Sequence, residues 1–392
     1  MSIGLLCDYL ETDEMGIKQT AQELGIDLVY IPFRKISITI DPEGYDMHSK
    51  GNNYTRLIKE DVKVVLNRVQ SKNRRLMAAT FLEAIDKPAL NPLHVEFLCF
   101  SKFRTLLYLS KSGIKVPKTV FIPCNSRERT KKGTSIHNEE EIVDLLQQSF
   151  DGAVVVKPDA GTHGRGIKLA KNREELLNAV KSTKLSIINP IGILAQDFIQ
   201  KWFYDLRIIV LKEKGKAPYC YPKAMARAGF KDFRTNTALG NFVLDVDLPL
   251  HIRELASRCG AVIGGKCDAW VLALDAMIPM DKNKLNDEAY VMAELKKLAK
   301  AFQEVKKVKS DPSKKRAFPD WNKKLEESFE RYKSLEAYEN IKKIVNESVE
   351  KGKHEILFHE ANSCPEFWEQ TRLATGANIA EYLLSCAKSI FD

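Results

Sequence analysis

The stretch from Phe358 to Phe367 reads FHEANSCPEF, and the rest of the chain can be interpreted around it. If residues 356–360 form a strand, Glu360 and Asn362 lie on one face, because side chains along a strand alternate between faces. Oxygen atoms at this spacing can share a hard cation such as Mg²⁺, which leaves positions for phosphate and water. A solvated strand end explains the same pattern, so other residues must decide between the two interpretations.

The composition indicates a globular protein with more than one domain. The chain has 392 residues, of which 44% are hydrophobic and 29% are charged, and chains of this length usually form two or three domains. No apolar run reaches the roughly 20 residues that a membrane helix needs, and the first residues show no signal-peptide pattern. We therefore expect a cytoplasmic protein with no membrane partner.

The distribution of charge bears on the type of partner, and the cysteine spacing bears on metal sites and disulfides. The net charge is +9, but residues 281–353 alone contain 19 Lys and Arg against 14 Asp and Glu. A nucleic-acid partner is therefore not the favoured interpretation, although an anionic partner fits. The eight cysteines include no C-x-x-C pair, which gives no support for a zinc site or a disulfide framework. Reduced and mostly buried thiols are expected.

The first 95 residues are expected to form a small α/β domain. Apolar strand patterns at Ile3–Leu6, Asp27–Ile31, Val62–Val69 and Ala89–Asn91 alternate with helical periodicity near Gly16–Leu24. Strands that alternate with helices indicate a parallel sheet. No G-x-G-x-x-G sequence occurs in this region, so a dinucleotide-binding role has no support.

A glycine-rich loop follows a valine-rich strand pattern at Ala153–Lys157. Residues 158–166 read PDAGTHGRG, and a second strand pattern follows at Ile167–Ala170. Glycines let backbone N–H groups approach an anion closely, so a hairpin that covers phosphates fits, as does an ordinary glycine hairpin. A P-loop does not fit, because neither a helix nor a G-K-[ST] sequence follows the glycines.

Several helices have clear sequence signals. One follows Pro92, carries Lys102 and ends near Gly113, while others begin after Asn138 and Asn172 with glutamates in the first turn, where the helix dipole favours them. Residues 281–353 carry apolar side chains at helical spacing with prolines between them, so a charged helical hairpin is expected. Its apolar stripe is interpreted as a packing face rather than a ligand site.

A third candidate metal ligand precedes this hairpin. Asp275 follows the apolar strand pattern Trp270–Leu274. Its carboxylate would complete an oxygen-ligand set with Glu360 and Asn362. An Asp at a strand end can equally cap a turn.

Taken in order, several segments resemble the ATP-grasp superfamily, and within it the RimK and LysX group of carboxylate–amine ligases. They are Lys157-Pro158 before the glycine hairpin, Gln196–Ile199, Asp205–Arg207, Phe233–Asn236, Asp275 and Glu360–Asn362. The likeness extends from about Lys102 to the end of the chain. It implies an α/β (α+β) fold with a domain at residues 1–95 that precedes the ATP-grasp fold, and ATP-grasp parts at 96–193 and 194–392, the last with a helical insertion at about 281–353.

The resemblance also implies roles for single residues. The residues implied to bind ATP are Lys102, Lys157, Gly161, Thr162, His163, Gly164, Arg165, Gly166, Gln196, Asp197, Phe198, Ile199 and Asp205. Those implied to bind Mg²⁺, or Mn²⁺ in its place, are Asp275, Glu360 and Asn362. Those implied to face phosphate and the acceptor carboxylate in catalysis are Arg207, Arg227, Arg234 and Asn236.

The implied reaction is an ADP-forming ligation. A carboxylate on a peptide, protein tail or small molecule attacks the γ-phosphate of ATP, and the amine of an amino acid such as glutamate then displaces phosphate from the acyl phosphate. Cations and metal ions stabilise the negative charge of both steps, and the arginine fork can hold two oxygens at once.

Two features depart from the family pattern. Pro365-Glu366-Phe367 stands where RimK-like chains have a Pro-Gly turn, and it is closer to the Glu-Phe of LysX-like members. Glu366 either faces the incoming amino group or is an exposed carboxylate at a helix start. The insertion lies outside the common core and could serve a separate acceptor, a partner or a homo-oligomer contact.

Two other functional classes remain open. An ATP-grasp small-molecule kinase, such as an inositol phosphate kinase, would bind a polyanion, which Arg68, Lys72, Arg74 and Arg75 would suit; the same residues would suit an acidic peptide. A non-catalytic nucleotide-binding protein is the third class. The apparently complete metal set argues against it.

Overall fold

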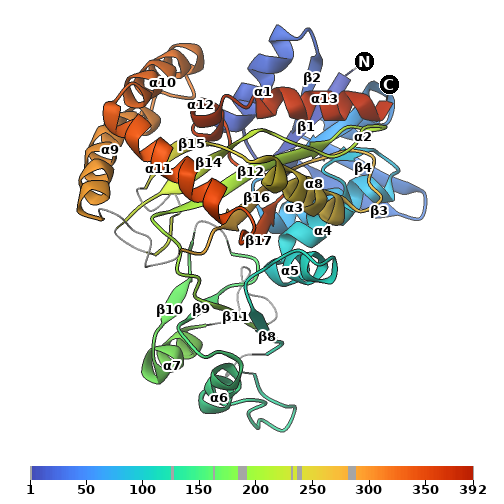
Figure 1. Ribbon diagram of the computed structural model, residues 1–392. Coiled ribbons are helices and arrows are strands. Elements are labelled where there is room, and N and C mark those ends of the chain that lie inside the picture. The colour runs from blue at the N-terminus through green and yellow to red at the C-terminus, as the bar shows by residue number, and fades with distance from the viewer. Residues whose placement is uncertain are drawn as a thin grey trace.

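The structure is a computed structural model, and it describes residues 2–124, 128–161, 164–183, 192–230, 233–235, 241–280 and 288–391 (Figure 1). Within these residues the strands form four sheets that are accompanied by helices, which confirms the predicted α/β (α+β) class. The predicted domain boundaries at 95/96 and 193/194 stay predictions.

The N-terminal part is built on a parallel sheet with the strand order β2-β1-β6-β7. Its strands and main helices are β1 (Ser2–Cys7), α1 (Thr12–Glu23), β2 (Asp27–Pro32), β6 (Val62–Asn67), α3 (Lys72–Ala84) and β7 (Ala89–Leu90). Every residue of β1 is buried, because a central parallel strand packs on both faces. The predicted parallel sheet is confirmed.

A small antiparallel sheet, ordered β3-β4-β5, lies between β2 and β6 in the chain, and we number it as the fourth sheet, after the parallel first sheet and the two larger sheets described below. It comprises β3 (Ser37–Asp41), β4 (Gly44–Ser49) and β5 (Asn52–Asn53), with short helical turns at Phe33–Lys35, Tyr54–Arg56 (α2) and Leu57–Asp61. None of these strands was predicted from the sequence. Most of their residues are exposed, so no buried face produces a strand periodicity.

The helix predicted after Pro92 is two helices, α4 (Leu93–Phe100) and α5 (Lys102–Lys111). Ser101 separates them with an extended backbone and caps α5, because its Oγ accepts a hydrogen bond from the Arg104 N–H. Serine is a preferred helix cap. The break places Lys102 at the first position of α5.

The second sheet is antiparallel, with the order β10-β9-β11-β8, and it stands apart at the bottom of Figure 1. Its elements are β8 (Thr119–Ile122), α6 (Glu139–Ser149), β9 (Val154–Lys157), β10 (Lys168–Ala170), α7 (Arg173–Ser182) and β11 (Ile193–Asp197). Strands β9 and β10 pair as neighbours, as predicted for the glycine hairpin. Asn138 and Asn172 cap α6 and α7, so both predicted helix starts are confirmed.

The third sheet is the largest and is antiparallel, with the order β15-β14-β12-β16-β17 and β13 beside β12. Its strands are β12 (Tyr204–Lys212), β13 (Tyr219–Cys220), β14 (Lys223–Ala228), β15 (Phe242–Asp247), β16 (Trp270–Met277) and β17 (Leu357–Asn362). Helices α8 (Leu250–Gly264) and α13 (Ile379–Phe391) pack against β12 and β16. Asp275 does not end its strand as expected, because β16 continues to Met277.

Over its described residues, 288–353, the insertion is not a hairpin but three helices, α9 (Glu288–Lys309), α10 (Phe318–Lys333) and α11 (Glu336–Gly352). The backbone of Leu335 is extended and turns the chain between α10 and α11, a break that the apolar spacing did not reveal. The predicted packing face is confirmed, since Leu298, Phe302 and Phe329 are fully buried. Tyr332 and Tyr338 attach the helices to β15 by hydrogen bonds to Val243 O and to Asp245.

The cysteines and the helices relate to the expectations of reduced, buried thiols and of no membrane-spanning segment. All eight cysteines are free, and six of them are buried. Within the described residues, no helix combines the length and the apolar character that crossing a membrane would require.

The two ends of the chain meet where α1 packs beside α13 (Figure 1). The short helix α12 (Thr371–Thr375) precedes α13, and the loop before α12 carries Trp368, whose indole lies against Gly16 of α1. A Cβ atom at Gly16 would overlap the indole ring. The N-terminal domain and the loop after β17 are therefore in close contact at this glycine.

We expect Gly16→Ala to destabilise the protein, by about 1–3 kcal/mol as for overpacked cores. A loss of stability would be informative, because replacing glycine by alanine inside a helix ordinarily stabilises it. Thermal unfolding measures the change, and Gly152→Ala is the matched control, since a Cβ atom there meets nothing within 4 Å. A Gly16→Ala protein as stable as the control would contradict the contact.

Candidate active site

One cavity of about 840 Å³ brings together the second sheet, the third sheet and the N-terminal part, a volume in the range of ligand pockets. The predicted site residues that line it are Lys102, Lys157, Gly161, Gly164, Arg165, Gln196, Asp197, Phe198, Ile199, Asp205, Arg207, Arg227, Arg234, Asp275, Glu360 and Asn362. Gly166 is not among its lining residues, but a Cβ atom at Gly166 would lie 3.3 Å from Pro158, which lines the cavity. Thr162, His163 and Asn236 lie outside the described residues.

Two lysines mark the end of the cavity below the glycine loop. Lys102 Nζ donates a hydrogen bond to Gly161 O at 2.6 Å and lies 3.3 Å from Glu360 Oε1. Lys157 ends β9 and is buried. Burial, together with the positive charge of Lys102, lowers the pKa of Lys157 to about 7. With Lys102 and Lys157 near the single carboxylate of Glu360, an anionic ligand would balance the remaining positive charge.

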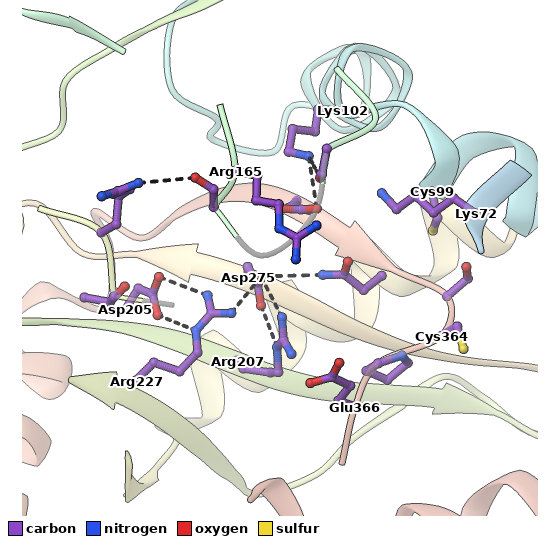
Figure 2. A pocket seen from close by; sticks show the side chains of 18 of the residues that line it. Lys72, Cys99, Lys102, Arg165, Asp205, Arg207, Arg227, Asp275, Cys364 and Glu366 are labelled. Atoms are coloured by element: carbon purple, nitrogen blue, oxygen red, sulfur yellow. Dashed lines mark hydrogen bonds and ion pairs between the residues drawn. The ribbon is translucent and has the colours of Figure 1, made fainter. Parts of the chain in front are cut away.

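The glycine loop is anchored to α5. The Phe103 N–H donates to Asp159 Oδ1 at 2.8 Å, and the Lys102 N–H donates to Asp159 O at 3.1 Å. Gly164 has a φ of 69°, a left-handed conformation that glycine adopts without strain. Arg165, from the same loop, points across the cavity toward Asp275 (Figure 2).

The end of β11 forms another wall. Gln196 donates from its side chain to Thr119 Oγ1 at 2.8 Å, and the Phe198 ring meets the Phe233 ring with centroids 6.0 Å apart. The Asp197 and Phe198 N–H groups donate to Lys118 O and Ala153 O. These two amides therefore already donate hydrogen bonds within the protein. An adenine base at this wall would have to bind other groups of the segment 196–199.

An ion-pair network crosses the floor of the cavity (Figure 2). Arg227 donates to both carboxylate oxygens of Asp205, at 2.7 and 2.9 Å, and its Nη1 lies 3.2 Å from Asp275 Oδ2. Arg207 donates to both oxygens of Asp275 at 3.0 Å. Sheet register explains the network, because Asp205 faces Arg227 and Arg207 faces Asp275 across neighbouring strands.

The same network sets the charge of Asp205. Burial would raise the pKa of this carboxyl group, but Arg227 and Lys201 hold it well below its ordinary value. Lys201 Nζ lies 3.6 Å from Asp205 Oδ2 and donates to Thr235 Oγ1 at 2.7 Å. Lys201 was not predicted, although it follows the Gln196–Ile199 segment by only two residues.

The three residues proposed as metal ligands lie on the paired strands β16 and β17. Asp275 and Glu360 are register partners on β16 and β17, and Asn362 Nδ2 lies 3.5 Å from Asp275 Oδ2. Burial opposes ionisation of Glu360, but Lys102, Lys72 and Lys157 lower its pKa below the ordinary value. Within the described residues, no three His, Cys, Asp or Glu side chains form a metal cluster. The donor set of two carboxylates and one amide suits a hard cation that phosphate oxygens help to bind.

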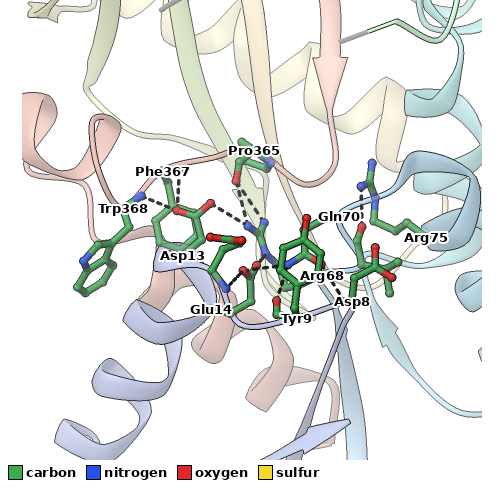
Figure 3. Close-up of polar contacts among 12 residues, drawn as sticks. Asp8, Tyr9, Asp13, Glu14, Arg68, Gln70, Arg75, Pro365, Phe367 and Trp368 are labelled. Atoms are coloured by element: carbon green, nitrogen blue, oxygen red, sulfur yellow. Dashed lines mark hydrogen bonds and ion pairs between the residues drawn. The ribbon is translucent and has the colours of Figure 1, made fainter. Parts of the chain in front are cut away.

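The basic residues of the N-terminal part are mostly committed to carboxylates (Figure 3). Buried Arg68 pairs with Asp13 at 3.3 Å and with Glu14 at 3.2 Å, and it donates to Pro365 O. Arg75 and Arg74 pair with Glu96 and Asp8, so these arginines hold the cavity wall together. Lys72 differs, because no ion pair joins it to a described residue, and burial with nearby Lys102 lowers its pKa to about 8.

Comparison with known proteins gives the family. The family model for the RimK-like ATP-grasp domain matches residues 100–305, which is more than half of the chain. The α-aminoadipate–LysW ligase LysX of Sulfurisphaera tokodaii is 26% identical over 266 residues, covering 68% of this chain and 82% of that protein. The coenzyme γ-F420-2:α-L-glutamate ligase of Methanocaldococcus jannaschii is 26% identical over 197 residues, covering 49% and 58%.

Solved structures share the fold over nearly the whole chain. D-alanyl-alanine synthetase A of Vibrio cholerae has a TM-score of 0.55 at 12% identity, covering 99% of this chain and 97% of that chain. VanG D-Ala:D-Ser ligase of Enterococcus faecalis has a TM-score of 0.54 at 12% identity, covering 99% and 98%. The chain therefore belongs to the RimK-like ATP-grasp family, whose members are ADP-forming carboxylate–amine ligases that use ATP and a divalent metal.

Proposed function

We propose that the protein joins the amino group of an amino acid to a carboxylate on a peptide, a protein tail or a small cofactor, with ATP and Mg²⁺. The observation that carries this proposal is that buried lysines, arginines and the carboxylate and amide groups of Asp275, Glu360 and Asn362 line one shared cavity. Phosphoryl transfer to a carboxylate needs little more from the protein than this arrangement, because catalysis rests on positioning and on stabilising negative charge.

We assign the ATP to the side of the cavity formed by the second sheet. Lys102 and Lys157 would hold phosphate oxygens under the loop that contains Gly161 and Gly164, and the β11 end would hold the base. Asp275, Glu360 and Asn362 would hold Mg²⁺, which would offset the negative charge of the phosphate oxygens. Support comes from the shared lining of these residues and from their charges.

The reaction has two steps. A carboxylate oxygen attacks the γ-phosphorus, the bond to ADP breaks, and an acyl phosphate forms. The amine nitrogen then attacks the acyl carbon, phosphate leaves, and the nitrogen loses a proton to give the amide. We assign to Arg207 and Arg234 the role of offsetting the negative charge of the acyl phosphate, because both line the cavity; Arg207 would do so while its guanidinium group stays paired with Asp275.

For the amine, we propose an acidic amino acid such as glutamate. The names of the two relatives mention α-aminoadipate and L-glutamate, both of which carry a second carboxylate. Glu366 is exposed and lines the cavity, where its carboxylate can face an incoming ammonium group. This arrangement favours the first of the two interpretations of Glu366.

The decisive experiment screens ADP release over pairs of carboxylic acids and amines, with mass spectrometry of the product. We expect ADP and phosphate release to require both components, because the acyl phosphate is consumed only by an amine. ATP consumption with a hydroxyl acceptor alone, and a phosphorylated product, would instead establish the small-molecule kinase.

We expect Asn362→Ala to reduce turnover by about 100-fold or more, the scale of losing one group that stabilises transition-state charge. The melting temperature should stay unchanged, because among the described residues the Asn362 side chain makes a single long hydrogen bond, at 3.5 Å to Asp275. Asn346→Ala is the control, since Asn346 bonds exposed Asp247 away from the cavity. Full turnover in Asn362→Ala would remove this residue from the site.

ATP binding should weaken as the pH rises above 7. The Lys157 pKa of about 7 means that the free protein loses this positive charge above pH 7, whereas bound phosphate favours the charged form and raises the pKa. Binding then takes up a proton, and the dissociation constant rises by up to about tenfold per pH unit. Calorimetry in buffers of different ionisation enthalpy measures the uptake.

Lys157→Arg is the variant that tests the origin of this proton. Arginine stays charged throughout this range, so proton uptake at about pH 8.5 should fall by close to one proton per bound ATP. Equal uptake in the two proteins would assign the proton to another group, with Lys72 the next candidate because its pKa is about 8.

A further inference from the structure

The loop at residues 363–370, between β17 and α12, is held from two sides. From the N-terminal side, Asp13 accepts hydrogen bonds from the Phe367 and Trp368 N–H groups at 3.1 and 2.7 Å (Figure 3). From the insertion, Asn322 of α10 accepts a hydrogen bond from Trp368 Nε1 at 2.8 Å. The loop that carries Glu366 is therefore positioned jointly by the first helix and by the insertion.

Two lysines of the insertion reach the cavity beside this loop. Lys309 ends α9, and Lys314 follows in the turn before α10. Lys314 Nζ donates to Glu369 Oε1 at 2.8 Å, and Lys309 Nζ lies 3.5 Å from Glu369 Oε2. Both lysines, Glu366 and Glu369 line the same cavity as the proposed ATP and metal ligands.

Glu369 cannot satisfy both ammonium groups alone. Its Oε1 also accepts a hydrogen bond from Thr12 Oγ1 at 2.9 Å, while each ammonium group has three N–H donors. Lys309 has 17% of its side chain exposed, and burial lowers its pKa against the opposing effects of Glu369 and Glu366. Lys314 Nζ also donates to Lys309 O at 3.2 Å, and Glu366 acts on Lys309 as a second carboxylate. Three N–H donors on each ammonium group still leave room for a further anionic group.

We infer that Lys309 and Lys314 bind a carboxylate of the amine-donating amino acid, whose ammonium group faces Glu366. An amino acid carries both charges within a few bonds, and this wall offers the two opposite charges side by side. The insertion, which lies outside the common core of the fold, thereby selects the amino acid. This inference rests on the proposed ligase function and adds to it the residues that recognise one substrate.

The alternative is that Lys309, Lys314 and Glu369 only fasten the insertion to the loop. A fastening role predicts a loss of stability that affects all substrates alike. Amino-acid recognition predicts a selective loss of affinity for one substrate. The two outcomes separate when the half-saturating concentrations of ATP and of the amino acid are measured in the same variants.

The test compares Lys309→Met and Lys314→Met with the control Lys315→Met. Lys315 belongs to the same turn and also pairs with a glutamate, Glu11, at 2.6 Å, but it is 45% exposed and does not line the cavity. L-Glutamate and L-2-aminoadipate are the probes, measured by ADP release and by calorimetric binding in the presence of Mg²⁺ and ADP. We expect the half-saturating concentration of the amino acid to rise about 10- to 100-fold in Lys309→Met and Lys314→Met, the range for a lost charge-assisted hydrogen bond.

The remaining readouts keep the two proposals distinguishable. ATP saturation and the melting temperature should match those of the Lys315→Met control. Turnover whose amino-acid dependence is unchanged in Lys309→Met and Lys314→Met would overturn the subsite and leave the ligase standing. Lysine-dependent binding of either amino acid without turnover for any substrate pair would support the subsite and overturn the ligase. A wild-type protein that binds neither amino acid would overturn the subsite.

Discussion

The strongest constraint on this structure is the charge buried around Glu360 and Asp275. Lys102, Lys157 and Lys72 surround Glu360 closely enough to lower its pKa, while Arg207 and Arg227 share Asp275. Removing charged groups from water costs free energy, and only close partners of opposite charge offset this cost. The arginines already have partners, whereas Lys157 and Lys72 have lowered pKa values. The lysine side of the cavity is therefore the side that gains most from a bound polyanion.

The third sheet explains why the carboxylates and arginines meet at all. Asp205 and Arg207 are two residues apart on β12, so they share a face, and the neighbouring strands bring Arg227 and Asp275 opposite them. Strand β17 adds Glu360 opposite Asp275. Five charged groups on adjacent strands thus occupy one face at the spacing of cross-strand pairs. A shift of one residue in any of these strands would move its charges to the opposite face.

Part of this arrangement could be predicted from the sequence, and the reasons for success and failure are physical. The parallel N-terminal sheet, the glycine hairpin and the shared face of Glu360 and Asn362 follow from local periodicity, which a single segment contains. The pairing of Arg227 with Asp205 depends on register between distant strands, and no single segment contains that information. The insertion was predicted as a two-helix hairpin because the turn at Leu335, which separates α10 from α11, contains no glycine or proline to mark it.

Lys309 and Lys314 show the same limit at the level of the site. In the sequence they are two of the 19 basic residues of the insertion, and only the fold separates them from Lys315, which is not among the residues that line the cavity. The groups proposed for phosphate and metal lie on β9, β16, β17 and α5, whereas the groups proposed for the amino acid lie on a loop and an insertion. Strands β9 and β16 are paired on both sides and β17 on one, so they tolerate little change in position, but a loop fastened by side chains can be altered without disturbing them. The groups proposed for phosphoryl transfer and those proposed to select the amino acid therefore lie in separate parts of the chain. Amino-acid specificity can then change while the phosphoryl-transfer site is kept.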